Sequence, residues 1–261
     1  MPPTPDELVE QRIASALALV GSDRAQADRI TGAPAGYLVA LPGNDVARHA
    51  GLLATKPAPG EVRVVVTPGR HAGQWHLDVA GRDRPGLLAV CAGVLADRGI
   101  DVVQAVLATW DDGTALEAFV VRSTRPPDAT ALQDAFEASL DRAPRSSPVA
   151  GATVTFDPDA SDLYTACEVR APDEPGLLRN IAVAIAAARV DVHAARIETC
   201  DGHARNRFDL SDGAAGGGGS GGGGGKVRTE QEAAIRTFLA SGVTVPRRSR
   251  WAGLVHRRWR S

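Results

Sequence analysis

This chain of 261 residues has few cysteines, no long apolar run and no secretory start. Its three cysteines, Cys91, Cys167 and Cys200, lie far apart and form no C-x-x-C pair, so neither a disulfide framework nor a zinc site is indicated. The first ten residues contain proline and acidic residues where a secretory signal needs a basic start and an apolar run. Because no stretch suits a membrane span either, we predict a globular cytoplasmic protein without a membrane partner.

Charge is nearly balanced over the whole chain but not along it. The formal net charge is −2, yet the last sixteen residues hold six arginines and no acidic residue. The body is therefore mildly acidic, and the tail over residues 247–261 is basic. A basic tail with two tryptophans can contact nucleic acid or anionic lipid, but exposed charge at a terminus is usually solvated, so we expect no nucleic-acid partner.

The most informative feature is an internal repeat with a shift of ninety positions. GRDRPGLLAVCAGVLADRGIDVVQA (81–105) and APDEPGLLRNIAVAIAAARVDVHAA (171–195) share an Asp-x-Pro-Gly-Leu-Leu motif and a later Asp-Val pair. One deletion further on, Phe119 aligns with Phe208. A colinear series of this length predicts a duplicated domain.

Hydrophobic periods predict the same elements in both copies. Alternation that ends at Val79 and Val169 indicates a strand, Pro-Gly breaks it, and apolar residues at helical spacing follow. In the first copy two strands joined by Asp111-Asp112-Gly113 come next. A helix over 128–140 and a strand over 152–156 complete the order βαββαβ, which is a ferredoxin-like α+β unit.

The second copy departs from the first near its end. A capping-box spacing at Thr229 to Glu232 predicts the start of its second helix, and its last strand is shortened to 242–245. Before that helix we expect a flexible Gly-rich loop over 213–225. The predicted organisation is a helical N-terminal segment and linker over 1–70, domains over 71–157 and 162–246, and the tail over 247–261.

Three residues with reactive side chains are predicted to be structural. Cys91 and Cys167 fall in phase with apolar positions, which favours the core over a nucleophilic role. His193 replaces Val103 of the first copy, which favours a packed histidine over a ligand.

The βαββαβ order with D-x-P-G-L-L between its first strand and helix resembles the ACT domain, a small-molecule sensing module of amino-acid-regulated proteins. GYLVALPGNDVARHAGLLA before the first copy, ATVTFDPDASDLYTACEVRAPDEPGLL between the copies and DVHAARIET in the second are similar to the C-terminal third of bacterial PII uridylyltransferases. There, too, two ACT domains stand in tandem. The resemblance covers roughly residues 36–239 and implies a tandem regulatory region.

The catalytic motifs of that family are absent. In those enzymes a Gly-Ser followed by an Asp-x-Asp pair marks the nucleotidyltransferase domain, and an HD domain removes the nucleotide. Here Gly21-Ser22 has no Asp-x-Asp pair at a workable distance, no His-Asp dipeptide occurs, and the six histidines do not cluster as two-metal chemistry requires. We therefore predict no enzymatic activity, no catalytic residue, no metal and no cofactor.

The repeated motif predicts a pocket for a free amino acid. Pro-Gly permits a tight turn that brings N–H groups at the helix start toward the strand end, which suits a carboxylate, while Asp83 or Asp173 can pair with an amino group. The resemblance places a contact from the neighbouring unit at Asp101 and Asp191, so adjacent copies would close the pocket. Alternatively, the motif only builds a capped turn. The candidate binding residues are Asp83, Pro85, Gly86, Leu87, Asp101, Asp173, Pro175, Gly176, Leu177 and Asp191.

Three functions stay open on the sequence. The first is a regulatory protein that senses an amino acid, with glutamine favoured because the resembled enzymes report nitrogen status. The second is a fragment or decayed homologue of a PII uridylyltransferase, acting with a PII-type signalling protein or a separate catalytic chain. The third is a protein interaction module with an empty pocket. A homodimer through the ACT sheets is a further candidate assembly.

Overall fold

The computed structural model describes residues 3–162, 164–213 and 225–245. Helices come first: α1 (Pro5–Val20), α2 (Arg24–Thr31), α3 (Ala35–Ala40) and α4 (Gly43–Leu53). The first copy then holds β1 (Arg63–Pro68), β2 (Gln74–Arg82), α5 (Leu87–Asp97), β3 (Asp101–Thr109), β4 (Thr114–Arg122) and α6 (Ala129–Ser139). The second copy repeats this order with β5 (Thr153–Asp157), β6 (Thr165–Pro172), α7 (Leu177–Ala187), β7 (Val190–Cys200), β8 (His203–Asp212) and α8 (Thr229–Ser241).

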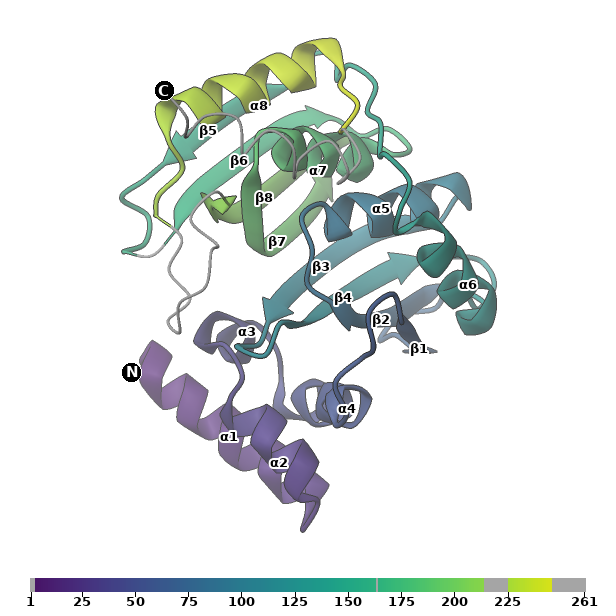
Figure 1. Cartoon of the computed structure of the whole chain (residues 1–261), viewed down its shortest axis with the longest axis vertical. Helices are drawn as coiled ribbons and strands as arrows, with labels where there is room; N and C mark the ends of the chain where they lie inside the picture. The colour runs from purple at the N-terminus through teal and green to yellow at the C-terminus, as the bar shows by residue number, and fades with distance from the viewer. Residues whose placement is uncertain (1–2, 163, 214–224, 246–261) are drawn as a thin grey trace, which may run out of the picture.

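The strands of the described ranges form one eight-stranded antiparallel sheet in the order β1-β2-β4-β3-β7-β8-β6-β5 (Figure 1). Read inward from its two edges, the order passes through the same strands of the two copies: β1, β2, β4 and β3 from one edge, and β5, β6, β8 and β7 from the other. A pseudo-twofold axis therefore passes between β3 and β7. Ala105 pairs with Ala195 at the axis, and these two residues are equivalent at the shift of ninety. Both strands also bulge at the same place, at Val103 and His193. The duplication and the fold class of two tandem ferredoxin-like units are confirmed.

In each copy the strand at the outer edge of the sheet comes before the strand with which it pairs, whereas the sequence analysis predicted that it would come last in the copy. We expected residues 152–156 to close the first copy, but β5 pairs with β6 of the second. In the first copy β1, from the stretch expected to be a linker, fills the equivalent place beside β2. Strands β1 and β2, like β5 and β6, follow each other in the chain and pair across a short loop. For β5 to pair with β2 instead, the chain would have to close a loop that contains most of the first copy. Because closing a longer loop costs more conformational entropy, the strand that is adjacent in the chain is the favoured partner.

The end of the second copy also corrects the prediction. Helix α8 begins at Thr229 as expected, but its N-cap is Arg228, whose N–H donates to Gln231 Oε1 at 3.0 Å, so the capping pair is shifted by one residue from Thr229 and Glu232. In place of a strand over 242–245, Thr244 makes one isolated bridge to Arg145. That edge of β6 is already covered by β5. Most of the predicted Gly-rich loop and the basic tail, 214–224 and 246–261, lie outside the described residues.

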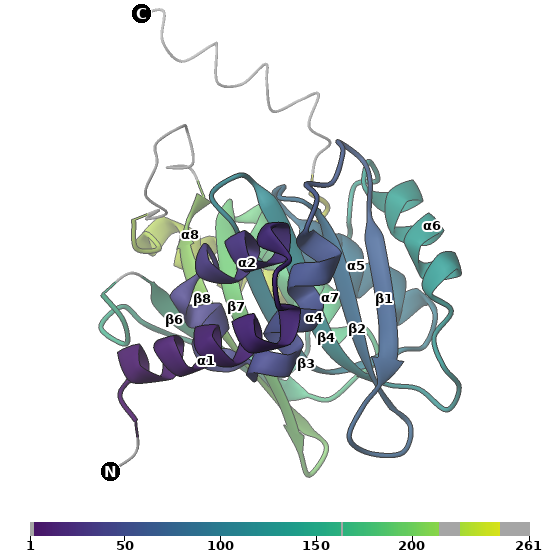
Figure 2. The same cartoon turned by 90° about the horizontal axis from the view of Figure 1, so that it is seen from below.

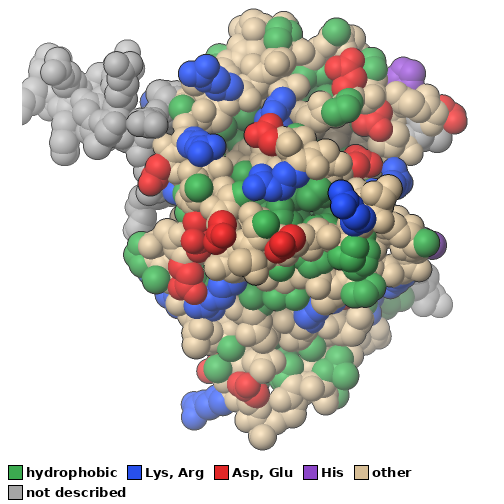
Figure 3. Space-filling view, turned by 90° about the vertical axis from the view of Figure 1, so that its right-hand side faces the viewer, with side chains coloured by type: hydrophobic (Ala, Val, Ile, Leu, Met, Phe, Trp, Pro, Cys, Tyr) green, Lys and Arg blue, Asp and Glu red, His purple; other side chains and the backbone are tan. Residues whose placement is uncertain are grey.

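Helices cover the two faces of the sheet unequally (Figures 1 and 2). Helices α5 to α8 pack on one face over both copies, in a core that includes Phe119, Ile181 and Phe208. Helices α1 to α4 pack on the opposite face of the first copy alone, over Val106 and Leu116. Acidic and basic side chains are interspersed on the face shown in Figure 3. No helix in the described part of the chain is long and apolar enough to cross a membrane.

A buried series of polar side chains fastens the N-terminal helices to the sheet. Tyr37 Oη lies 2.8 Å from His49 Nδ1, and His49 Nε2 lies 3.0 Å from Asp78 Oδ1. Arg48 Nε donates to Asp78 Oδ2 at 2.7 Å. Burial by itself would raise the pKa of Asp78, but the hydrogen bonds and charges of His49 and Arg48 hold that pKa below its usual value. Asp78 on β2 is therefore the acceptor on which the attachment of α4 depends.

We expect Asp78→Ala to destabilise the protein by about 3 kcal/mol, because Arg48 and His49 lose their shared acceptor while they remain buried or half-buried. Urea unfolding followed by circular dichroism measures the change. Asp134→Ala, at an exposed position of α6, is the matched control and should change the free energy of unfolding by less than about 0.5 kcal/mol. Equal effects of the two substitutions would contradict the role of Asp78.

Candidate functional site

The Asp-x-Pro-Gly motif builds the same turn in both copies. Gly86 and Gly176 are the N-caps of α5 and α7, with φ of 81° and 82°, in the left-handed region that favours glycine. The Asp173 N–H donates to the carbonyl of Gly202 at 2.9 Å, and an equivalent bond holds the first copy's turn to its own hairpin. An α-helix leaves the N–H groups of its first turn without intrahelical acceptors. In each copy the turn itself accepts the first of them, since the Leu87 N–H donates to the carbonyl of Arg84 at 3.1 Å and the Leu177 N–H to that of Glu174 at 3.0 Å.

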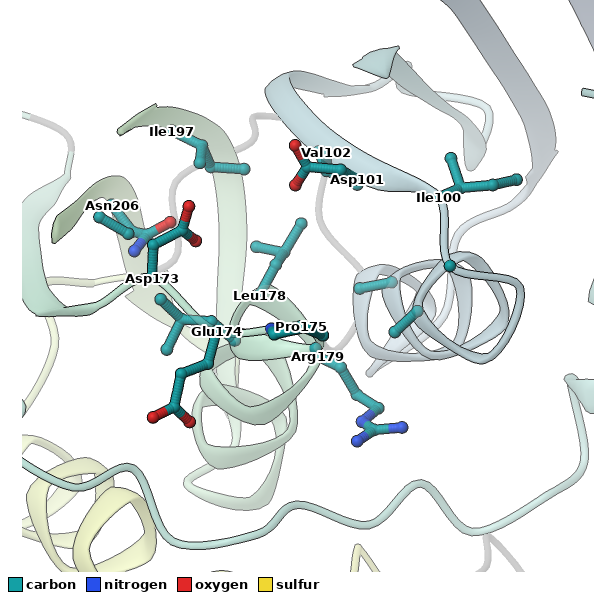
Figure 4. A pocket seen from close by; sticks show the side chains of 16 residues that line it. Ile100, Asp101, Val102, Asp173, Glu174, Pro175, Leu178, Arg179, Ile197 and Asn206 are labelled. Carbon is teal, nitrogen blue, oxygen red and sulfur yellow. The ribbon is translucent and has the colours of Figure 1, made fainter. Parts of the chain in front are cut away.

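A cavity of about 300 Å³ lies between the motif of the second copy and the start of β3 in the first (Figure 4). Its volume is at the lower end of the range for small-molecule pockets. Both copies contribute to it. The first copy lines it with Ala92, Ala96, Gly99, Ile100, Asp101 and Val102, and the second with residues 173–179, Ile197, Ala204 and Asn206.

Acidic side chains from opposite copies meet at this cavity. Burial raises the pKa of Asp101, the charge of Arg122 opposes this rise, and the charge of Asp173 adds to it. Arg122 forms an ion pair with Asp101 at 3.2 Å, in which both side chains are largely exposed. Figure 4 shows that the neighbouring Glu174 points away from the space between Asp101 and Asp173. The cavity therefore has an acidic side that suits a ligand ammonium group.

Asn206 on β8 adds a buried amide to the cavity. It is 1% exposed, lines the cavity beside Asp173 in Figure 4, and its Nδ2 has no hydrogen-bond partner among the described residues. A buried donor without an acceptor costs about 1–3 kcal/mol. The sequence analysis missed Asn206, although a polar residue between Ala204 and Phe208 interrupts the apolar alternation of this strand.

The first copy places a different side chain at the equivalent position. Glu117 lies between Val79 and Leu107 in the sheet, as Asn206 lies between Val169 and Ile197. Glu117 is 2% exposed, and its Oε2 has no hydrogen-bond partner among the described residues.

Several carboxyl groups of the first copy's site have raised pKa values. Burial raises the pKa of Glu117 to about 8, against a hydrogen bond with Cys91 and with a further contribution from Asp83. Burial and the charges of Asp83 and Asp212 likewise raise the pKa of Asp191. The pair of Asp83 and Asp191 therefore repeats the pair of Asp173 and Asp101 across the pseudo-twofold axis.

The structure thus gathers the predicted residues into two groups. Asp173, Pro175, Gly176 and Leu177 line one cavity with Asp101, as expected for adjacent copies. Asp83, Pro85, Gly86 and Leu87 form the equivalent turn, and Asp83 acts electrostatically on Asp191. Ligand binding by either group stays a prediction.

Cys91, Cys167 and His193 pack against neighbouring residues, as predicted, and none of them lines the cavity. Cys91 and Cys167 are buried in the core, and burial raises the pKa of both thiols. His193 stacks on Tyr164 with ring centroids 4.3 Å apart, and its Nε2 lies 2.7 Å from Ser211 Oγ. The described residues contain no group of three or more His, Cys, Asp or Glu that could hold a metal ion.

A second cavity, of about 340 Å³, lies on the opposite face of the sheet, under α4. Its polar lining includes Arg48, His71, His76 and Gln104. The sequence pattern did not indicate it, because these residues come from separate elements that only the packing of α4 brings together.

No protein-family model matches the chain. The bifunctional uridylyltransferase/uridylyl-removing enzyme of Gluconobacter oxydans is 30% identical in an alignment of 175 positions that covers 58% of this chain and 18% of that enzyme. The enzyme of the same name from Rhodospirillum rubrum is 27% identical in an alignment of 224 positions that covers 77% of this chain and 23% of the enzyme. The chain thus spans about a fifth of the length of these relatives. Among solved structures, aspartate kinase from Synechocystis is 19% identical, covers 66% of this chain and 28% of its own, and has a TM-score of 0.38.

The buried carboxyl group of Glu117 should make stability depend on pH. Its pKa is about 8 in the folded chain and near its ordinary value when unfolded, so the folded state keeps a proton that the unfolded state has lost. The free energy of unfolding should therefore fall as pH rises from about 5 to 8. Glu117→Gln should flatten this decline and stabilise the protein at pH 8 on the order of 3 kcal/mol.

Denaturant unfolding at pH 5, 6, 7 and 8 tests this expectation. Asp134→Asn removes an exposed carboxyl group from α6 and should leave the decline as in the unmodified protein. An unchanged decline in Glu117→Gln would show that Glu117 is already ionised at neutral pH.

Proposed function

We propose that this chain, which is homologous to bifunctional uridylyltransferase/uridylyl-removing enzymes over part of their length, is a regulatory unit that binds a free amino acid between its two copies. One observation carries the proposal: the cavity joins Asp101 of one copy to the Asp-x-Pro-Gly turn of the other. A turn that served only as a helix cap would need no contribution from the second copy.

The cavity offers a separate group for each part of an amino acid. The N–H groups in the first turn of α7 suit the α-carboxylate, because the helix start carries partial positive charge. Asp173 and Asp101 suit the α-ammonium group from two sides. Leu178 and Ile197 supply an apolar lining for the side chain, which then reaches toward Asn206.

Glutamine is the favoured ligand, because the resemblance is to enzymes that report nitrogen status. Signalling to a PII-type protein, or action beside a separate catalytic chain, belongs to the same proposal, since the relatives are about five times longer than the matched part. A homodimer could form at the exposed edges β1 and β5, where each strand has a partner on one side only within the described sheet.

Isothermal titration of the full chain with the twenty common amino acids tests binding directly. We expect glutamine to bind, and Asp173→Asn to weaken its affinity at least about tenfold, because the ammonium group loses an ionic partner. The matched control is Glu174→Gln, the adjacent carboxyl group that points away from the cavity, and it should leave the affinity within about twofold. If no amino acid binds, the protein is an interaction module instead.

Nucleotide transfer is the second activity to measure, since the relatives are named as transferases. Incubated with a PII-type protein, UTP and Mg²⁺, the chain should transfer no uridylyl group, because its sequence has none of the family's transfer motifs. Intact-mass spectrometry of the PII-type protein gives the readout. Metal-dependent uridylylation by the purified chain would overturn the proposal of a purely regulatory unit.

A further inference from the structure

The cavity under α4 takes no part in the proposed amino-acid site. It has a volume of about 340 Å³, and α3 and α4 lie over it while β2, β4 and β3 form its floor, on the sheet face that carries the N-terminal helices in Figure 2. The motif turns and the layer of α5 to α8 lie on the opposite face. A molecule bound under α4 would therefore contact neither Asp-x-Pro-Gly turn.

Two polar side chains lie on the floor of this cavity. On β2, Asp78 contacts α4, so the side chain of His76, two residues earlier, points to the same face of the sheet. On β3, Val106 packs under the N-terminal helices, and Gln104 is related to it in the same way. Val120 of β4 pairs with both His76 and Gln104. The two polar side chains therefore belong to one row across three adjacent strands.

The hairpin loop between β1 and β2 adds two further donors at the open side of the cavity. Arg70 and His71 line the cavity and are exposed to solvent. No described residue forms a side-chain hydrogen bond or ion pair with them, or with His76 or Gln104. A guanidinium, a carboxamide and an imidazole of either tautomer each have at least one N–H to donate. Four donor groups from three segments of the chain thus line one space without an acceptor from the described residues.

The acidic side chains of the lining are already paired. Arg48 Nε donates to Asp78 Oδ2 at 2.7 Å, and its Nη1 lies 2.5 Å from Asp45 Oδ1. Asp78 is also bonded to His49. The side chains of Asp78 and Asp45 are 2% and 11% exposed, against 25% for Arg48. The guanidinium group is therefore the most accessible part of this cluster.

The net charge of the whole lining depends on pH. Its two arginines balance its two aspartates, and its remaining ionisable groups are three histidines. A histidine takes up a proton between about pH 8 and pH 5. His71 and His76, which have no acidic partner among the described residues, therefore make the cavity increasingly positive as pH falls. His49, held between Asp78 and Tyr37, adds one more positive charge when it is protonated.

The second copy has no equivalent of this polar floor. At the shift of ninety, His76 corresponds to Ala166 and Gln104 corresponds to Ala194. Helices α1 to α4 likewise cover the first copy alone. The polar side chains therefore do not belong to the duplicated frame, and they occur in the copy whose sheet is covered by helices on this face.

The arrangement of donors suits a phosphate group. The floor and the hairpin loop are separate parts of the lining, so their N–H groups approach from different directions. A phosphate group has oxygens that point in several directions, whereas the two oxygens of a carboxylate lie in one plane. The lining also includes Leu41, Pro42 and Val106, which suit the organic part of an ester, and the volume falls within the range of small-molecule sites.

We propose that the cavity under α4 binds a small phosphate monoester, with its phosphate group held by Arg70, His71, His76 and Gln104. This is a second ligand site, confined to the first copy. It goes beyond the proposed amino-acid function and does not depend on it.

Isothermal titration of the full chain with inorganic phosphate, phenyl phosphate and succinate, at pH 6.5 and constant ionic strength, tests the ligand class. We expect one phosphate or one phenyl phosphate to bind per chain. Phenyl phosphate should bind at least about threefold more tightly than phosphate, because its ring adds apolar contact. Succinate should bind at least about tenfold more weakly than phenyl phosphate.

Two substitutions test the place of binding. Arg70→Ala and His76→Ala should each weaken the binding of phenyl phosphate at least about fivefold, because a charge-assisted hydrogen bond is lost. The matched controls are Arg142→Ala, after α6, and His203→Ala, at the start of β8, both at exposed positions outside the cavity. Each control should leave the affinity within about twofold. Arg70 is exposed on a loop, so its variant is expected to fold, and circular dichroism checks both.

Sulfate tests the role of the histidines, because its charge does not change between pH 6 and 8. Its affinity for the unmodified chain should fall at least about fivefold over this range, as His71 and His76 lose their protons. An affinity that does not depend on pH would exclude these histidines from the site.

The remaining outcomes each contradict one part of the inference. If neither phosphate nor phenyl phosphate binds, the cavity is not a phosphate site. If succinate binds as tightly as phenyl phosphate, the assigned ligand class is wrong. If both Arg70→Ala and His76→Ala bind phenyl phosphate as the unmodified chain does, the ligand binds elsewhere. None of these results bears on the amino-acid cavity, which is tested with separate ligands.

Discussion

The contact between β3 and β7 is the constraint on which the rest of this structure depends. Each copy alone is a half-sheet with two strand edges, β1 and β3 in the first copy and β5 and β7 in the second. Pairing at Ala105 and Ala195 joins the half-sheets, and small residues allow the helices above them to approach. A side chain at Gly86 would meet Ala186 at 3.6 Å, and one at Gly176 would meet Ala96 at 3.7 Å. The two motif turns therefore pack against the helix of the opposite copy.

The candidate site is a consequence of this join. Asp101 begins β3 and Asp173 begins the turn after β6. They are neighbours only because β3 and β7 pair antiparallel across the axis. The same operation places Asp83 near Asp191. Repulsion between the two carboxylates of each pair destabilises the protein without a ligand, and a cationic group placed between the two carboxylates of a pair would reduce that repulsion. This links the geometry of the duplication to the chemistry of the proposed ligand.

The pseudo-symmetry is broken where the two copies have different neighbours. Helices α1 to α4 cover the outer face of the first copy and bury Asp78 with His49 and Arg48. The outer face of the second copy carries exposed ion pairs instead, such as those of Glu168 with Arg170 and Arg205. The copies also differ inside, at Glu117 and Asn206. Duplication thus supplied two similar frames, and substitution at a few positions made them chemically distinct.

The sequence by itself determined the duplication, the ferredoxin-like class and the motif turns, because these depend on local periods, on Pro-Gly breaks and on residues repeated at a constant shift. The resemblance to the ACT domain also implied that adjacent copies would bring Asp101 to the motif of the other copy. Only the tertiary structure decided which strands complete each half-sheet, since β5 has an antiparallel edge available on either side of it in the chain and pairs with the nearer one. The same holds for Asn206, Glu117 and Asp78: a polar residue in an apolar strand is visible in the sequence, but whether it is buried, and what it faces, depends on the packing of elements far apart in the chain.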